Sequence, residues 1–240
     1  MTDYRLDRLL AQAAQMTRTQ ARGAIFLGRV TVDGKPCNRP EQKVSQEAVL
    51  TLDGGPLCWQ KYVYLMLHKP QGVVSAARDA HDVTVADLVK AEYPRRTLFP
   101  AGRLDKDSTG FVLLTDDGAL AHDLLAPRRH VDKTYFVKID TPITKAMEQG
   151  FTQGVTLADD TRMMPAELHP DAQDPFAATV ILHQGVYHQI KRMFGVFDAG
   201  VTALHRVAIG GVMLDESLAP GASRPLTQSE LALLQKAVQK

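Results

Sequence analysis

Apolar and polar positions near the N-terminus recur with the spacing of an amphipathic helix. Between positions 6 and 14, the apolar residues follow the i, i+3, i+4, i+7 pattern of one helical face. The polar residues that would then lie on the solvent side are Arg5, Asp7, Arg8 and Gln12. Because one apolar stripe needs a partner, we expect a second element packed against this helix.

A second helix and a hairpin are predicted next along the chain. Thr17 followed by Gln20 has the form of a capping box, and Gly28 would end the helix that this box opens. Apolar and polar residues then alternate up to Asp33-Gly34, which is a turn signal for a β-hairpin. Residues 53–61 combine glycines with a proline, and we interpret them as a linker into a second domain.

The rest of the chain alternates strand-like and helix-like segments. The strands are expected at 62–68, 111–115, 133–139 and 179–182, with a turn at 116–118, short helices after Thr84 and around 190–197, and a C-terminal helix opened by Thr227 and Glu230. Neighbouring strands without steady helical crossovers favour a mixed, largely antiparallel sheet. We therefore predict an α+β chain, with a small N-terminal α/β domain at 1–58 and a mixed-sheet domain at 62–240.

Length and composition are those of an ordinary globular protein. The 240 residues are 45% hydrophobic and 23% charged, with a net charge of +1. Residues 1–10 contain no apolar run before a cleavage site, and no run approaches the roughly 18 residues of a membrane helix, so we expect a cytoplasmic protein with no membrane contact. Cys37 and Cys58 form no CxxC motif, and His183 and His188 lack i, i+4 spacing, so we expect reduced thiols and no bound metal.

Positive charge is concentrated in residues 1–43, which contain eight Lys or Arg and four Asp or Glu. The basic residues on the polar face of the predicted unit are Arg5, Arg8, Arg18, Arg22, Arg29 and Lys35. Such a face is either merely solvated or binds the phosphate groups of a nucleic acid. The order RLDRLL, TRTQAR and GRVTVDGK resembles the S4-type RNA-binding module, and this resemblance implies that the six residues contact RNA.

The stretch GRLDKDSTG at 102–110 places charged residues between apolar segments. Asp105 or Asp107 could simply cap a turn, as Ser108 and Thr109 would allow. The phosphate-binding motifs GxxxxGK[ST] and GxGxxG and the serine-hydrolase motif GxSxG do not occur, which argues against phosphoryl transfer, hydride transfer and serine hydrolysis. The residues alone leave open whether the aspartates are structural or catalytic.

Four spaced motifs of the second domain resemble those of the RNA pseudouridine synthases. They are HKPQG (68–72), GRLDKDSTGFVLLTDDG (102–118), PRRHVDKTY (127–135) and YHQIKRM (187–193). The segment 204–227 continues the likeness, which is greatest for the branch that contains ribosomal small-subunit pseudouridine synthase A. The resemblance implies an enzyme that isomerises a uridine in RNA to pseudouridine and uses no cofactor or metal.

The resemblance also implies roles for individual residues. Asp105 matches the essential aspartate, a nucleophile or general base in a reaction that breaks the N1–C1′ bond, turns the uracil and joins C5 to C1′. Lys191 matches its basic partner, Tyr135 the ring that packs against the uracil, and Arg103 a residue that binds the RNA backbone or replaces the extruded nucleotide. Without the resemblance, these three would be interpreted as a surface lysine, a core tyrosine and a structural arginine, and we expect Asp107 in a surface turn.

A second basic cluster and the choice of RNA complete the predictions. Arg128, Arg129, His130 and Lys133 lie close together in sequence, and we expect them to contact RNA.

The likeness indicates a monomeric enzyme acting on 16S ribosomal RNA within a small-subunit assembly intermediate, although enzymes for large-subunit RNA share the same motifs. The alternatives are a non-catalytic S4-containing assembly factor and a two-carboxylate hydrolase, for which the sequence offers no second positioned acid.

Overall fold

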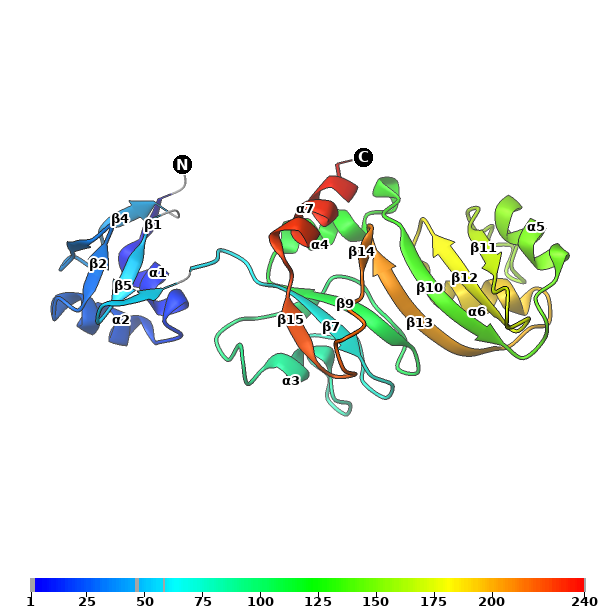
Figure 1. Cartoon of the computed structure of the whole chain (residues 1–240), viewed down its shortest axis with the longest axis horizontal. Coiled ribbons are helices and arrows are strands. Elements are labelled where there is room, and N and C mark those ends of the chain that lie inside the picture. The colour runs from blue at the N-terminus through cyan, green and yellow to red at the C-terminus, as the bar shows by residue number, and fades with distance from the viewer. Residues whose placement is uncertain (1–2, 46–47, 58, 240) are drawn as a thin grey trace. The chain divides into compact units, whose positions relative to one another are not determined.

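The computed structural model describes residues 3–45, 48–57 and 59–239 of the chain. It divides into two compact units, which we call the N-terminal unit (residues 1–62 with 93–96) and the C-terminal unit (residues 63–92 with 97–240) (Figure 1). Cys37 is a buried free thiol, and Cys58 lies outside the described residues. No helix within the described ranges is both long enough and apolar enough to cross a bilayer.

The N-terminal unit packs two helices against short strands. Its elements are β1 (Asp3–Arg5), α1 (Leu6–Ala13), α2 (Arg18–Phe26), β2 (Val30–Val32), β3 (Lys35–Pro36), β4 (Lys43–Ser45), β5 (Leu50–Leu52) and β6 (Gly55–Leu57). The strands form an antiparallel sheet in the order β3-β2-β5-β6 and a separate pair, β1-β4. The predicted helix pair and hairpin are confirmed, because Thr17 and Gln20 form the capping box and Gly28 follows α2 with a φ of 67°.

Asp7 does not lie on the solvent side of α1, so that prediction is wrong. Its side chain is fully buried, and its carboxylate binds Arg5 (Nη2 to Oδ2, 3.0 Å) and Arg18 (Nη2 to Oδ1, 3.2 Å). The two arginine side chains themselves remain about half exposed. Burial alone would raise the pKa of Asp7, but the hydrogen bonds from both arginines outweigh it and lower that pKa.

The interpretation of residues 53–61 as a linker is also wrong over its first half. Asp53 (φ 51°) and Gly54 (φ 78°) form a tight turn, and the next three residues form β6, which pairs with β5. Two successive left-handed residues are what a type I′ hairpin turn requires. The connection into the C-terminal unit therefore lies beyond residue 57.

The C-terminal unit is built on one mixed sheet. Its elements are β7 (Tyr64–Lys69), α3 (Val85–Val89), β8 (Phe99–Pro100), β9 (Thr109–Thr115), α4 (Gly118–Leu125), the 3-10 helix η1 (Pro127–Arg129), β10 (Lys133–Ile139), α5 (Lys145–Gln153), β11 (Glu167–Pro170), β12 (Ala177–Leu182), α6 (Gln189–Gly195), β13 (Val201–Ile209), β14 (Val212–Met213), β15 (Ser223–Pro225) and α7 (Gln228–Ala237). The strand order is β11-β12-β10-β13-β9-β7-β15, with β14 beside β13 and β8 beside β9. Only the pairing of β13 with β9 is parallel among the described strands. The predicted mixed, largely antiparallel sheet is confirmed.

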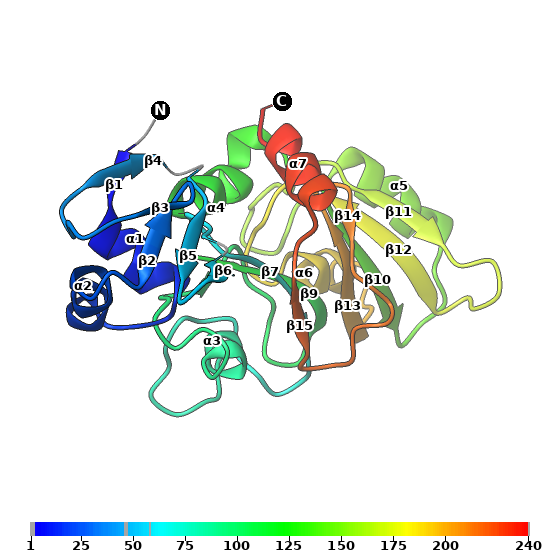
Figure 2. The same ribbon diagram turned by 60° about the vertical axis from the view of Figure 1, so that its left-hand side comes forward.

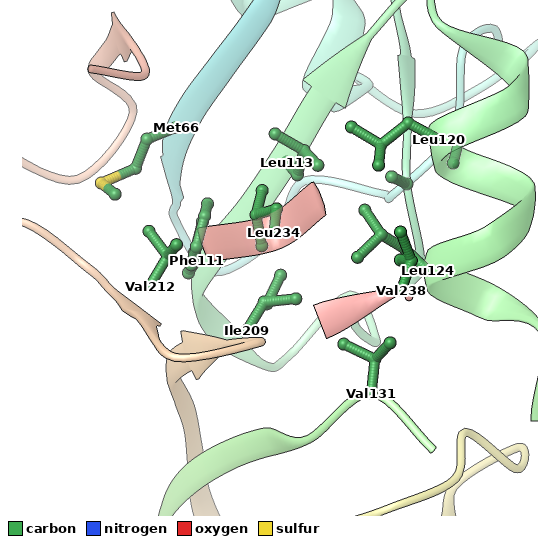
Figure 3. Packing of buried hydrophobic residues seen from close by; sticks show 12 residues of the cluster. Met66, Phe111, Leu113, Leu120, Leu124, Val131, Ile209, Val212, Leu234 and Val238 are labelled. Carbon is green, nitrogen blue, oxygen red and sulfur yellow. The ribbon is translucent and has the colours of Figure 1, made fainter. Parts of the chain in front are cut away.

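Helices pack against this sheet at several places. The helix α7 lies beside β14 and also contacts α4, and α5 lies next to β11 at the far end of the sheet (Figures 1 and 2). Buried side chains of β9, including Phe111 and Leu113, lie against Leu120 and Leu124 of α4 and Leu234 of α7 (Figure 3). Full burial of each such side chain contributes about 1.5–3 kcal/mol. This core therefore anchors β9, the strand that follows the GRLDKDSTG loop.

The parallel junction of β9 with β13 requires a glycine. Gly110 lies opposite Arg206 in the strand register and has a φ of 107°. A Cβ at this position would lie 2.3 Å from the Arg206 carbonyl oxygen and 2.6 Å from its backbone nitrogen. Because neither backbone atom can move aside like a side chain, only glycine fits. The junction brings the GRLDKDSTG and LHRVAIGG segments, which are far apart in sequence, into direct contact.

Candidate active site

The loop of residues 101–108, between β8 and β9, carries Asp105 and is held by a buried lysine. Lys69, the last residue of β7, is fully buried. Its Nζ donates hydrogen bonds to the carbonyl oxygens of Ser108 (2.6 Å) and Lys106 (3.3 Å). Burial lowers the pKa of Lys69 to about 8, because the charged form is poorly solvated there. The lysine of the HKPQG motif thus fixes the backbone just beyond Asp105.

Two more side chains hold the same loop from other segments. Arg206 of β13 is 1% exposed, and it donates hydrogen bonds to the carbonyl oxygens of Phe111 (Nε, 2.7 Å) and Arg103 (Nη1, 3.4 Å). The Ser75 hydroxyl accepts from the Leu104 N–H and donates to the Leu104 carbonyl, both at 3.0 Å. Backbone on both sides of the catalytic candidate is therefore fixed by partners remote in sequence, as a preorganised site requires.

A cavity of about 410 Å³ adjoins this loop. Its walls come from the loop, from β10 and β13, and from residues 185–191 at the start of α6. Four side chains that the sequence predicts at one centre line it together: Arg103, Asp105, Tyr135 and Lys191. The volume falls within the range of about 300–1,000 Å³ found for small-ligand sites. Over residues 3–45, 48–57 and 59–239, no group of three or more His, Cys, Asp or Glu side chains is placed to hold a metal ion.

The Asp105 carboxylate lies between two nitrogen groups, one near each oxygen. His188 Nε2 is 3.2 Å from Oδ1, and Lys191 Nζ is 3.5 Å from Oδ2. The aspartate side chain is 26% exposed, so it is neither sealed in the core nor directed into bulk water. Burial would lower the pKa of Lys191, but its hydrogen bond to Asp107 and the charges of both aspartates raise it. The lysine is therefore a stable cation beside Asp105.

Asp107 is an exposed turn residue, as its position in the sequence predicts, and it also binds Lys191. The Nζ of Lys191 lies 2.9 Å from Oδ1 and 2.7 Å from Oδ2 of Asp107, closer than it lies to Asp105. This hydrogen bonding lowers the pKa of Asp107. Lys191 is thus shared by two carboxylates, of which only Asp105 lines the 410 Å³ cavity.

The inner wall of the cavity carries Tyr135 beside buried cations. Tyr135 is 7% exposed on β10 and lies opposite Arg206 in register, with the guanidinium carbon 6.0 Å from its ring centroid. Arg206 Nη2 is buried without a hydrogen-bond partner among the described residues. Lys133 is also buried, with Nζ donating to the Val131 carbonyl (2.9 Å), and burial lowers its pKa to about 8. Lys133 therefore lines the cavity instead of lying on an exposed surface with Arg128.

Most of the other predicted RNA-contacting residues are exposed, but some are engaged in ion pairs. Arg8, Arg22 and Lys35 have exposed side chains on the N-terminal unit. Arg5 and Arg18 are paired with Asp7, and Arg29 donates to Asp53 (Nε to Oδ1, 2.8 Å). In the C-terminal unit, η1 presents an exposed Arg128 and a half-buried Arg129. Each unit thus has basic side chains at its surface.

Three residues of the site were not predicted from the sequence. Lys69 and Arg206 lie inside segments that carry the family likeness, but nothing in the local pattern indicates that a charged side chain in a strand is buried against loop carbonyls. The spacing of His188 in the sequence bears only on metal binding, and its position beside Asp105 follows from the turn that precedes α6. The sequence signal that could have indicated this position is the spacing of three residues between His188 and Lys191, because residues three apart at the start of a helix lie on the same side of it.

Comparison with known proteins follows the two units. Residues 63–195 match the family model described as RNA pseudouridylate synthase, and residues 5–50 match the S4 domain. The ribosomal small subunit pseudouridine synthase A of Escherichia coli is 40% identical over 230 residues, which is 95% of this chain and 98% of that protein. YtzG of Bacillus subtilis, named as an RNA pseudouridine synthase, is 40% identical over 233 residues, or 96% and 98% of the two chains. A crystal structure of a pseudouridylate synthase superposes with a TM-score of 0.68 at 37% identity, covering 96% of this chain and 99% of that chain.

Proposed function

The chain belongs to the RNA pseudouridylate synthase family, and on that premise we propose that it isomerises one uridine of 16S ribosomal RNA with Asp105 as its catalytic residue. Its activity is pseudouridine synthesis, and an S4 domain at its N-terminus makes RNA its partner. The observation that carries the proposal is the position of the Asp105 carboxylate, at the wall of the cavity between His188 and Lys191.

The site suits a carboxylate that must stay ionised. At 3.5 Å and an effective dielectric constant of about 20, Lys191 attracts Asp105 by about 5 kcal/mol before desolvation and solvent screening reduce that figure. An ionised Asp105 can attack the ribose as a nucleophile or remove a sugar proton. In either route the N1–C1′ bond breaks, C5 bonds to C1′, the C5 hydrogen is lost as a proton, and N1 gains a proton.

Tyr135 provides the ring on which the detached uracil rests while it turns. Taking a base out of its stack costs a few kcal/mol, and stacking on an aromatic ring returns about 1–3 kcal/mol. Tyr135 lies opposite the buried Arg206 in the strand register, with the guanidinium carbon 6.0 Å from the centroid of its ring. Arg103, exposed at the cavity, binds the RNA backbone or fills the space that the uridine vacates.

RNA outside the cavity is bound by the basic side chains of both units. Arg5, Arg8, Arg18, Arg22, Arg29 and Lys35 of the S4 domain, together with Arg128 and Arg129, contact phosphate groups, whereas Lys133 acts within the cavity. Such contacts supply affinity and orientation with little sequence information. We take residues 1–58 as the RNA-binding domain and 62–240 as the catalytic domain of a monomeric, cytoplasmic enzyme that acts on an assembly intermediate of the small subunit.

The proposal is tested by mapping the modification on defined RNA. The purified protein is incubated with unmodified 16S RNA, unmodified 23S RNA and a small-subunit assembly intermediate, and pseudouridine is located by carbodiimide treatment and reverse transcription. We expect one modified position in 16S RNA, formed fastest in the assembly intermediate. Modification of 23S RNA alone would contradict the substrate assignment, and release of free uracil would contradict isomerisation.

A further inference from the structure

His188 contacts Asp105 but belongs to none of the roles assigned so far. Its Nε2 lies 3.2 Å from Asp105 Oδ1, whereas Lys191 approaches the other oxygen. The imidazole lines the cavity and is partly buried, with 35% of its side chain exposed. A separation of 3.2 Å lies at the upper end of the range found for N–H···O hydrogen bonds. The carboxylate thus has a separate partner for each oxygen, and the two partners are three residues apart in sequence.

The backbone of His188 is held in an unfavourable conformation. Its φ of 51° and ψ of 32° lie in the left-handed region, which costs free energy for a residue with a Cβ. His188 occupies the N-cap position of α6, yet its side chain makes no capping hydrogen bond. Residues that remain in such conformations cluster at functional sites. Here the left-handed turn puts the imidazole beside Asp105 instead of on the helix end.

A neighbouring ring restrains the imidazole. The rings of Tyr187 and His188 stack with centroids 3.8 Å apart and an interplanar angle of 18°. Tyr187 is 69% exposed, so the stack adds little to the core and covers one face of the imidazole at the cavity wall. A histidine that is stacked on one face and in contact with Asp105 at its edge has little freedom to rotate.

We propose that His188 is a positioning residue that donates its Nε2–H to Asp105 Oδ1 and fixes the plane of the catalytic carboxylate. This inference rests on the proposed function of Asp105. With Oδ1 held by the imidazole, Oδ2 is presented to the ribose while the Lys191 cation lies beside it. Misplacement of a reacting group by about 1 Å can cost about 100-fold in rate, so the orientation of the carboxylate matters even when its charge is intact.

Replacement by glycine separates the effect of the His188 imidazole from that of its left-handed backbone conformation. Glycine adopts a positive φ without strain, so His188→Gly keeps the left-handed turn and removes only the imidazole. We expect its Tm to stay within about 3 °C of the wild-type value, since relief of strain offsets the added freedom of the unfolded chain. We expect kcat to fall by about 10- to 100-fold with little change in KM, because the RNA-binding surface is intact.

A rescue variant and a matched control keep the test specific. His188→Gln restores an N–H donor at similar reach, and Gln15 shows that glutamine adopts a φ of 52° in this chain, so we expect kcat within a few-fold of wild type. Asp198→Gly relieves the same backbone conformation (φ 54°) at an exposed site beyond the other end of α6, and we expect no loss of kcat. Wild-type kcat for His188→Gly, a folded His188→Gln as slow as His188→Gly, or a defect confined to KM would each overturn the inference.

A spectroscopic measurement does not depend on the activity. The imidazole ¹⁵N chemical shifts of His188 are recorded by NMR in the RNA-free wild-type protein and in Asp105→Asn. We expect the Nε2 resonance to move because its carboxylate partner is replaced by an amide. An unchanged resonance would overturn the contact between His188 and Asp105, even if the wild-type protein forms pseudouridine. A wild-type protein that modifies no ribosomal RNA would overturn the proposed function instead.

Discussion

Gly110→Ala is the substitution for which the structure gives the clearest magnitude. The new Cβ would lie 2.3 Å and 2.6 Å from backbone oxygen and nitrogen of Arg206, and real Cβ contacts essentially never fall below 3.0 Å. The strands must therefore separate by several tenths of an ångström. Overpacking of this kind costs about 1–3 kcal/mol, and an L-residue at a φ of 107° costs about 1–3 kcal/mol more. Together these effects destabilise the C-terminal unit by about 4 kcal/mol.

A destabilisation of this size is readily measured by thermal unfolding. For a chain of this length, about 4 kcal/mol lowers the Tm by about 8–16 °C. Activity should also fall at temperatures where the variant is folded, because Arg206 holds the carbonyls of Arg103 and Phe111 on either side of Asp105. Gly195→Ala is the control, since Gly195 has open space around it and ends α6 without a positive φ, so its Tm should stay the same or rise. A Gly110→Ala protein that unfolds at the wild-type temperature would refute this account of the junction.

Three further predictions concern charge. Burial lowers the pKa of Lys69 to about 8, so the folded protein binds this proton less tightly than the unfolded chain does. The free energy of unfolding of the wild type should therefore rise relative to that of Lys69→Met by up to about 3 kcal/mol between pH 8 and pH 10.5. Urea-unfolding measurements in which the difference between the two proteins stays constant over this pH range would contradict this prediction. Asp7 has a lowered pKa, so its ion pairs stabilise the N-terminal unit fully above about pH 4, the unfolded value, and this contribution is lost progressively as pH falls from there through the lowered pKa. Asp7→Asn should therefore be less stable than the wild type at pH 7 by about 1–3 kcal/mol, with the difference shrinking below about pH 4. A pH-independent difference in denaturant titrations would be inconsistent with this role. Charge reversal of Arg8 and Arg22 together should weaken RNA binding. The slope of log K against log salt concentration should become less steep by at least about 0.7 for each phosphate group that is no longer neutralised. Unchanged binding would show that this face is merely solvated.

Local signals in the sequence predicted much of the secondary structure. The capping boxes that begin at Thr17 and Thr227 are present, and Thr84 caps α3 with Asp87 completing its box. The strand at 133–139 has the predicted bounds. These predictions succeed because capping and strand alternation are set by residues a few positions apart. The turn predicted at 116–118 instead caps α4 through the Asp117 side chain, since the same residue types begin helices and make turns.

The predictions that are wrong concern features that depend on contacts between residues far apart in the sequence. The glycines and proline of residues 53–57 are typical of a linker and of a hairpin alike. Only the pairing of β6 with β5 distinguishes the two structures. Helical periodicity places Asp7 toward solvent, but its side chain is buried in ion pairs with Arg5 and Arg18. Within the site, Asp105, Tyr135 and Lys191 were found through the likeness to a family, not through their spacing.

The supporting charges of the site could not be predicted in the same way. Lys69 and Arg206 act through carbonyl groups that reach them only after the sheet has formed. A sequence pattern records that a strand contains a cation, but it does not record whether that cation is buried. The physical reason is that a buried cation needs hydrogen-bond partners, and for Lys69 and Arg206 most of these are carbonyl oxygens of segments remote in sequence.

The central claim is that the carboxylate of Asp105 performs the chemistry, and a single-turnover rate tests it most directly. RNA labelled with tritium at C5 of uridine releases the label as the C5–C1′ bond forms, so release is followed for the wild type, Asp105→Asn and Asp107→Asn. We expect Asp105→Asn to be slower by at least about 10,000-fold. Asp107→Asn, which removes the other carboxylate bound to Lys191, should be slower by about fivefold or less, because exposed ion pairs contribute at most about 1 kcal/mol. Tritium release by Asp105→Asn at the wild-type rate would contradict the account.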